Sequence, residues 1–339
     1  EVAPAQHELA PVFDTTNVAV DHNQLTMEIM KKVADKHDLV CLLHEKPFEG
    51  INGSGKHNNW SMITDDGVNL LDPGKTPSEN IQFLVFLMAV IKAVDEYADL
   101  LRISVASAGN DHRLGANEAP PAVVSIFLGD ELTEVLKSIE NDTYFTSHGA
   151  VQMDIGATVL PHFVKDNTDR NRTSPFAFTG NKFEFRMLGS AASVANPNIV
   201  LNTAVAEALD QFAKELDGVA PEDMEHAVHE LIKRAIKKHK RVIFNGNGYT
   251  DEWIEEAEKR GLYNLKSTPD ALPMWIAQKN IDLFTKHSIF TSEELHSRYE
   301  IWLENYSKTI NIEALTMLEM ARKQLLPAIN AYMSEVANT

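Results

Sequence analysis

The stretch Asn52-Gly53-Ser54-Gly55-Lys56-His57-Asn58-Asn59-Trp60-Ser61 organises the rest of the chain. It opens with four small residues, two of them glycine, which allow a backbone to come close to a ligand. His57 follows directly and could ligate a metal. Alternate residues of an extended segment share a face, so His57, Asn59 and Ser61 are expected on one side. The stretch therefore predicts a binding site rather than part of a packed core.

Residues Gly50 to Lys56 also fit the G-x-x-x-x-G-K pattern of a phosphate-binding P-loop. That motif needs a Ser or Thr hydroxyl at the next position, followed by a helix whose N-terminus faces the phosphates. His57 supplies no hydroxyl, and the following Asn-Asn-Trp is a poor helix former. The pattern therefore disfavours a P-loop.

The same ten residues resemble a known binding loop. Asn-Gly-Ser-Gly-x-His, with a polar residue two positions on and Ser four positions on, resembles the glutamate- and ATP-binding loop of glutamine synthetases. The longer string from His44-Glu45-Lys46-Pro47-Phe48 through Ser61 is similar to the type III branch of that family. The resemblance implies that Asn52 and Gly53 hold the glutamate backbone, that His57 ligates a metal and that Asn59 and Ser61 contact the nucleotide.

Length and composition restrict the class of protein. With 339 residues, 24% of them charged and 44% hydrophobic, the chain is typical of a soluble globular protein of about two domains. A net charge of −18 argues against nucleic acid or an anionic membrane as partner. The longest apolar run, Phe83 to Ile91, falls short of the ~20 residues of a membrane span. A single cysteine, Cys41, excludes an internal disulfide and fits a reducing cytoplasm.

The N-terminal segment, from Glu1 to Glu8, resembles the family segment that supplies two metal-ligating carboxylates. On a flat strand two residues seven apart face opposite sides, so a turn near Pro4 to Gln6 is required for Glu1 and Glu8 to meet one metal. Without the resemblance, such glutamates are more often solvated. The chain begins with neither an initiator Met nor a signal-peptide pattern, so we expect an excerpt. The resemblance implies an N-terminal domain and two further metal-ligating glutamates before Glu1.

No regular element suits residues 107–120, and long irregular loops in compact domains are commonly functional. This segment is similar to the family segment in which an arginine binds the substrate carboxylate and a glutamate on a mobile flap shields the site. By position these residues are Arg113 and Glu118. His112 is expected to be structural or solvated.

Around position 184, Lys182, Glu184 and Arg186 alternate with Phe183 and its apolar neighbours, which predicts a strand with one charged and one apolar face. A solvated charged face is the simpler interpretation. The concentration of basic residues from position 170 to 186 in so acidic a chain instead suggests a phosphate site.

The family resemblance agrees with a phosphate site. It implies that Arg172 contacts the transferred phosphoryl group, that Glu184 ligates a metal and that Lys182 and Arg186 contact phosphates. Ala177 stands where the other bacterial branch has an arginine, so part of the nucleotide pocket must be built differently.

Hydrophobic periodicity and capping residues outline the other elements. The basic run 237–241 is explained by the dipole of its helix rather than by an anion site, and Met317 and Met320 are expected in the core. The expected elements are a surface helix over 25–38, a strand over 39–43, a buried helix from Pro77 to about 98 capped by Thr76, a buried strand over 123–128, and helices over 195–216, 221–240, from Thr250 to Gly261, from Thr291, and from 310 beyond 332.

The resemblance covers nearly the whole chain and implies an α+β fold, namely the glutamine synthetase catalytic-domain fold. In that fold a curved, mainly antiparallel sheet is flanked by helices, and the C-terminal region is helical. We expect residues 1–216 to form the catalytic core, with its N-terminal part missing and an insertion at about 130–168. Residues 217–339 would form the helical region.

Three carboxylates, Glu1, Glu8 and Glu184, with one imidazole, His57, suit Mg²⁺ or Mn²⁺ better than Zn²⁺. The resemblance implies ATP-dependent ligation of ammonia to glutamate through γ-glutamyl phosphate, in a cytoplasmic homo-oligomer of stacked hexameric rings. We expect the chain alone to be inactive. Two alternatives stay open: a ligase that joins glutamate to another amine, and a catalytically silent structural homologue.

Overall fold

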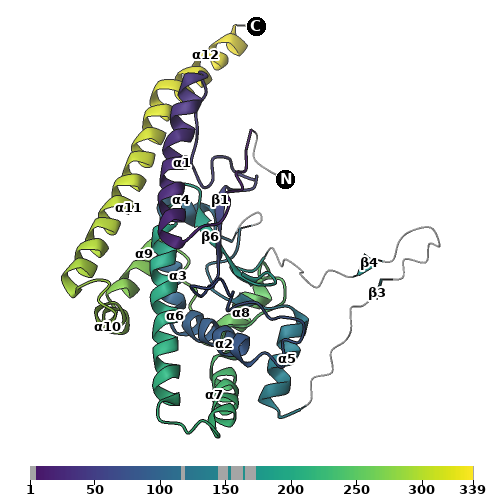
Figure 1. Ribbon diagram of the computed structural model, residues 1–339. Helices are drawn as coiled ribbons and strands as arrows, with labels where there is room; N and C mark the ends of the chain where they lie inside the picture. Colours follow the sequence, from purple (N-terminus) through teal and green to yellow (C-terminus); the bar gives the residue numbers. More distant parts are fainter. Residues whose placement is uncertain (1–4, 116–118, 144–151, 154–162, 165–172, 339) are drawn as a thin grey trace.

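The stretch that begins at Gly55 forms the edge strand of a four-stranded sheet (Figure 1). The strands are β1 (Gly55–Trp60), β6 (Phe183–Gly189), β5 (Phe176–Phe178) and β2 (Ile126–Phe127), in the spatial order β1-β6-β5-β2. The pairs β1–β6 and β6–β5 are antiparallel, and β5–β2 is parallel. This computed structural model describes residues 5–115, 119–143, 152–153, 163–164 and 173–338.

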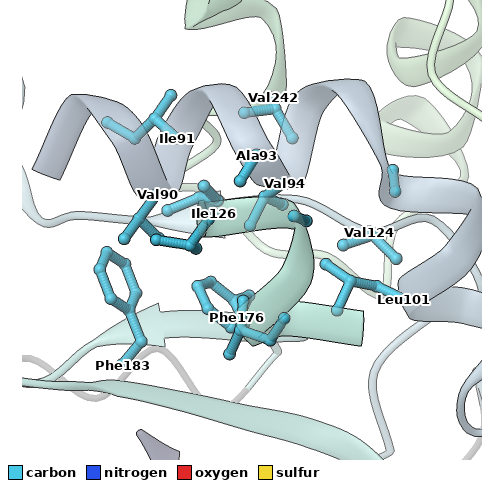
Figure 2. Close-up of a cluster of buried hydrophobic side chains, with 14 of the residues drawn as sticks. Val90, Ile91, Ala93, Val94, Leu101, Val124, Ile126, Phe176, Phe183 and Val242 are labelled. Carbon is cyan, nitrogen blue, oxygen red and sulfur yellow. The ribbon is translucent and has the colours of Figure 1, made fainter. Parts of the chain in front are cut away.

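The apolar side chains of the sheet pack against helices. Phe176 and Phe183 stack with ring centroids 4.8 Å apart, and both are fully buried. Figure 2 shows them facing Val90 and Val94 of α2 (Ile81–Glu96). Helix α2 is apolar on most sides and in turn packs against α6 (Ala195–Leu216) and α7 (Met224–His239). The expected burial of this helix is confirmed.

The long C-terminal helices extend along one side of the molecule (Figure 1). No helix among the residues described is both long and apolar enough to cross a membrane. The remaining elements are α1 (Thr16–Lys36), α3 (Ala98–Ile103), α4 (Ala108–Arg113), α5 (Asp130–Glu140), the short pair β3 (Gln152–Met153) and β4 (Phe163–Val164), η1 (Lys240–Val242), α8 (Asp251–Lys259), α9 (Thr268–Ala271), η2 (Leu272–Ile276), α10 (Gln278–Lys286), α11 (Ser292–Met320), the π-helical turn η3 (Ala321–Leu325) and α12 (Leu326–Ala337).

Several sequence-based predictions are confirmed. The α+β class holds, with a small, mainly antiparallel mixed sheet flanked by helices and a helical C-terminal region. Helix α6 has the predicted bounds, and Thr250 caps α8 by accepting a hydrogen bond from the Trp253 N–H. Thr291 opens α11 with a complete capping box.

Other predictions about the elements are wrong. Residues 39–43 form no strand, because the described part of the chain offers this segment no hydrogen-bonding partner strand. The buried helix is capped by Asn80 rather than Thr76: Asn80 Oδ1 accepts from the Phe83 N–H at 3.0 Å, whereas Thr76 closes only a turn. The segment 107–120 contains a regular element after all, helix α4. Residues 123–128 are all buried as expected, but only two of them form a strand.

The prediction that Met317 and Met320 lie in the core is wrong. They are 64% and 45% exposed on α11. Other apolar side chains of this part of α11, among them Ile312, Leu315 and Leu318, are exposed as well. Residues of the basic run form ion pairs with acidic side chains: His239 and Arg241 bind Asp95, and Lys240 binds Glu140. The explanation of this run by the helix dipole stays a prediction.

Candidate functional site

The register of β1 against β6 brings His57 to Glu184. Asn59 is the Cα partner of Glu184, and a shift of register lies between Lys56 and Asn58. His57 Nδ1 lies 2.9 Å from Glu184 Oε1. If Nδ1 carries the proton and donates it to this carboxylate, Nε2 keeps its lone pair free for a cation.

Arg186 lies beside Glu184 because residues two apart in a strand share a side. Its Nε and Nη2 donate to Glu184 Oε2 at 2.8 and 2.6 Å, which is a bidentate pair on one oxygen. The charged face expected of this strand is therefore not solvated, since the two side chains are only 12% and 5% exposed. Burial by itself would raise the pKa of Glu184, but the hydrogen bonds and positive charge of His57 and Arg186 outweigh it and lower that pKa to about 2. Glu184 is a carboxylate at any physiological pH.

Arg113 ends helix α4 with its guanidinium buried beneath the segment 50–55, here called the glycine loop. The side chain donates to Asn110 Oδ1 at 3.3 Å and to the carbonyl oxygens of Met187 and Arg186 at 3.4 and 3.3 Å. A Cβ added at Gly55 would lie 2.1 Å from Arg113 Nη2, and one at Gly53 would lie 2.9 Å from Arg113 Cγ. The loop can lie against this arginine only because both positions are glycine.

The charge of Arg113 has no direct counter-ion among the residues described. No carboxylate among the described residues lies within ion-pair distance of the Arg113 guanidinium. Arg113 as a whole residue is only 5% exposed. Loss of solvation lowers the pKa of Arg113 to about 10, while the charge of Glu45 partly opposes this shift. A buried guanidinium with spare N–H donors is a site suited to a carboxylate.

The predicted nucleotide contacts lie at the other end of the β1–β6 pair. Trp60 pairs with Phe183, so Ser61 and Lys182 come next to each other just beyond the two strands. The Ser61 hydroxyl lies 2.7 Å from Asn69 Oδ1 and 3.1 Å from the Asn181 carbonyl oxygen. Lys182 is half-buried and precedes the strand rather than lying in it.

The predicted ligand set is only partly brought together. Glu8 is exposed, and no group of three or more metal-ligating side chains occurs among the described residues. The pair of His57 and Glu184 fits a hard divalent cation in its donor chemistry, an imidazole with a deprotonated carboxylate. Glu1, Glu118 and Arg172 lie outside the described residues, and Asn52 is half-buried in the glycine loop. The metal-ligand, substrate and nucleotide roles therefore stay predictions.

Two further residues bear on the site. Ala177, which stands where the other branch has an arginine, is fully buried in β5 as the Cα partner of Glu184. Glu45, 4% exposed beside the glycine loop, received no role from its sequence, because glutamates are rarely buried and no periodicity marks this one. Its position within the string from His44 to Phe48 was the available signal.

Comparison with known proteins gives consistent matches. The family model for the glutamine synthetase catalytic domain matches residues 1–124, and the model for the glutamine synthetase C-terminal domain matches residues 227–339. A glutamine synthetase of Butyrivibrio fibrisolvens is 62% identical over 99% of this chain and 48% of its own length. A type-3 glutamine synthetase of Dictyostelium discoideum is 53% identical over 100% of this chain and 46% of its own.

A third relative, a glutamine synthetase of Bacteroides fragilis, is 44% identical over 99% of this chain and 47% of its own. A solved structure described as apo GmaS without ligand covers 87% of this chain and 51% of its own, with a TM-score of 0.49 and 16% identity. The chain spans about half the length of the curated relatives that it matches. With both family models and full-chain similarity to these relatives, the chain belongs to the glutamine synthetase family.

Proposed function

We propose that the protein containing this chain ligates ammonia to glutamate at the expense of ATP, through a γ-glutamyl phosphate intermediate, to give glutamine. Family membership supports this activity. The observation that carries it in the structure is the buried Arg113 guanidinium, which has no counter-ion among the described residues and lies against Gly53 and Gly55. A carboxylate that entered there would receive charge-assisted hydrogen bonds in a site of low dielectric.

The glycine loop and Arg113 would bind glutamate. Gly53 and Gly55 let the backbone approach the substrate, with Asn52 beside them, while Arg113 takes a substrate carboxylate. Because Arg113 is already held by the carbonyl oxygens of Arg186 and Met187, little reorganisation is needed when the substrate arrives.

The other residues of the site would act on the phosphates. When bound, Mg²⁺ or Mn²⁺ would neutralise charge on the ATP phosphates, held by Glu1, Glu8, His57 and Glu184. Arg172 and Arg186 would orient the transferred phosphoryl group. Asn59, Ser61 and Lys182 would contact the nucleotide, and Glu118 would help to exclude water, in which an acyl phosphate hydrolyses.

The division into a catalytic core over 1–216 and a helical region over 217–339, with an insertion at about 130–168, is part of this proposal. So are a homo-oligomeric assembly and a cytoplasmic location, the latter supported by the single cysteine, Cys41.

The test is an assay of the full-length protein with ATP, glutamate and ammonium. We expect one phosphate released per glutamine formed, and γ-glutamyl hydroxamate when hydroxylamine replaces ammonium, because hydroxylamine traps acyl phosphates. Turnover only with another amine would instead assign a glutamate-amine ligase. If neither ATP turnover nor binding of nucleotide and metal were seen, the proposed activity would be wrong.

A further inference from the structure

Glu45 is a buried carboxylate at the meeting point of three segments of the site. Its Oε1 accepts a hydrogen bond from the Ala191 N–H at 2.9 Å, just beyond the end of β6. Its backbone carbonyl accepts from the Ser54 N–H at 2.8 Å, within the glycine loop. Glu45 therefore connects the glycine loop to the sheet by both its backbone and its side chain.

Three glycines make room for this residue. A Cβ added at Gly109 of α4 would lie 2.5 Å from Glu45 Oε2, and one at Gly189 of β6 would lie 2.4 Å from Glu45 Oε1. A Cβ at Gly53 would lie 2.5 Å from the Glu45 carbonyl oxygen. Side chains at these positions would occupy the space of Glu45, so its place is defined on three sides.

The charge of Glu45 acts on two neighbouring cations. It is the largest influence that raises the pKa of Arg113 against the loss of solvation, which still lowers that pKa to about 10. It has the same effect on Lys56, whose pKa burial lowers to about 8. Since no described carboxylate pairs directly with Arg113, Glu45 balances the buried charge from a distance and leaves available those guanidinium N–H groups that do not already donate to protein oxygens.

We propose that Glu45 is a positioning residue for glutamate binding: it fixes the glycine loop against α4 and β6, and it supplies the negative charge that keeps the Arg113 guanidinium in place. It does not touch the substrate and acts through Arg113 and the loop. This inference rests on the proposed role of Arg113 in binding a substrate carboxylate.

The first experiment compares Glu45→Gln and Glu45→Asp in the full-length enzyme. Glu45→Gln keeps the shape and removes the charge, and we expect the KM for glutamate to rise roughly ten- to hundred-fold, about the effect on binding of one lost hydrogen bond to a charged group. The kcat and the KM for ATP should stay within about two-fold, because the lost interaction is made equally in the ground and transition states. Glu45→Asp keeps the charge and should lie between the wild type and Glu45→Gln.

The matched control is Asp99→Asn. Asp99 is a fully buried carboxylate in α3 that binds Lys279 Nζ at 2.9 Å and Asn280 Nδ2 at 3.0 Å, away from the glycine loop. Its loss should lower the unfolding temperature without changing the KM for glutamate. A KM for glutamate within two-fold of the wild type in Glu45→Gln would overturn the inference, and so would an equal rise in the KM for ATP.

A second variant displaces the Glu45 carboxylate without changing Glu45 itself. Gly109→Ala places a methyl group against Glu45 Oε2 and should displace it, so we expect the same selective rise in the KM for glutamate. Hydrogen exchange of the unliganded protein gives a readout that needs no activity. Glu45→Ala and Gly109→Ala should speed exchange of the Ala191 amide and of the loop 52–55, and Asp99→Asn should not.

The two hypotheses fail differently. A wild-type enzyme that makes no glutamine refutes the proposed function, and the exchange experiment then decides whether Glu45 holds the loop. An active wild type with an unaffected Glu45→Gln variant refutes the positioning role alone.

Discussion

Replacing Gly55 by Ala tests whether the glycine loop must lie against Arg113. The added Cβ would lie 2.1 Å from Arg113 Nη2, 2.4 Å from its Cζ and 2.7 Å from the Leu188 carbonyl oxygen, where ordinary contact begins at 3.4 Å. The guanidinium must therefore move by roughly 1 Å, a displacement that can cost as much as about a hundred-fold in the reaction of a positioned substrate. The carbonyl oxygen belongs to the paired strand β6 and cannot simply turn away.

The close contacts of the added Cβ with Arg113 and with the Leu188 carbonyl oxygen set the expected loss of stability and of glutamate binding. Overpacking of this kind costs about 1–3 kcal/mol of the free energy of unfolding, and in a domain of this size each kcal/mol lowers the unfolding temperature by about 2–4 °C. We expect Gly55→Ala to unfold several degrees below the wild type. We also expect a KM for glutamate at least ten-fold higher, with the KM for ATP little changed. Steady-state kinetics and calorimetry of the full-length protein provide both measurements.

Gly50→Ala is the matched control in the same loop. Gly50 has a φ of 73°, and a Cβ there would meet nothing within 4 Å, so the substitution adds backbone strain without a clash. That strain costs about 1–2 kcal/mol of the free energy of unfolding. Gly50→Ala should therefore lower the unfolding temperature about as much as Gly55→Ala does. If Gly55→Ala and Gly50→Ala had the same KM for glutamate, the contact between the loop and Arg113 would have no bearing on substrate binding.

Three further predictions concern single contacts. Arg113→Lys should raise the KM for glutamate at least ten-fold because an ammonium cannot reproduce the fork of donors; unchanged glutamate binding by calorimetry would contradict this role. The pKa of Glu184 is about 2 in the folded protein, below its ordinary value of 4.5, so its stabilisation is complete above about pH 4.5 and is lost as the pH falls toward 2. Urea unfolding of the wild type and Glu184→Gln should therefore differ by up to about 3 kcal/mol at pH 7 and converge near pH 2, and a gap independent of pH would refute the assignment. Asp95→Asn leaves the buried His239 and the exposed Arg241 without their carboxylate and should destabilise the protein by about 3 kcal/mol with no change in the KM for glutamate, which urea titration and kinetics would detect.

Strand β6 shows which structural features a sequence pattern predicts and which it does not. Alternation at period two correctly places Glu184 and Arg186 on one side, because that follows from strand geometry alone. Whether that side faces solvent or another element depends on the neighbouring strand. The register with β1 brings the exposed His57 to the buried Glu184, and no local pattern contains that register.

The incorrect predictions share one cause. Residues 39–43 have the composition of a strand, but a strand exists only with a partner. Thr76 and Asn80 are both residue types that cap helices, and in the folded chain Asn80 is the cap of α2. The two methionines on α11 were expected in the core, yet both side chains are exposed among the described residues.

The sequence by itself determined the family, the glycine loop, the charged alternation around Glu184 and most of the helices, because these are properties of neighbouring residues and of their spacing. The tertiary structure alone decided which distant groups meet: Arg113 beneath Gly53 and Gly55, His57 beside Glu184, and Glu45 between three segments. Burial and charge compensation depend on everything that surrounds a side chain. The order of residues along the chain does not contain that information. A buried glutamate such as Glu45 therefore cannot be distinguished from a solvated one without the fold.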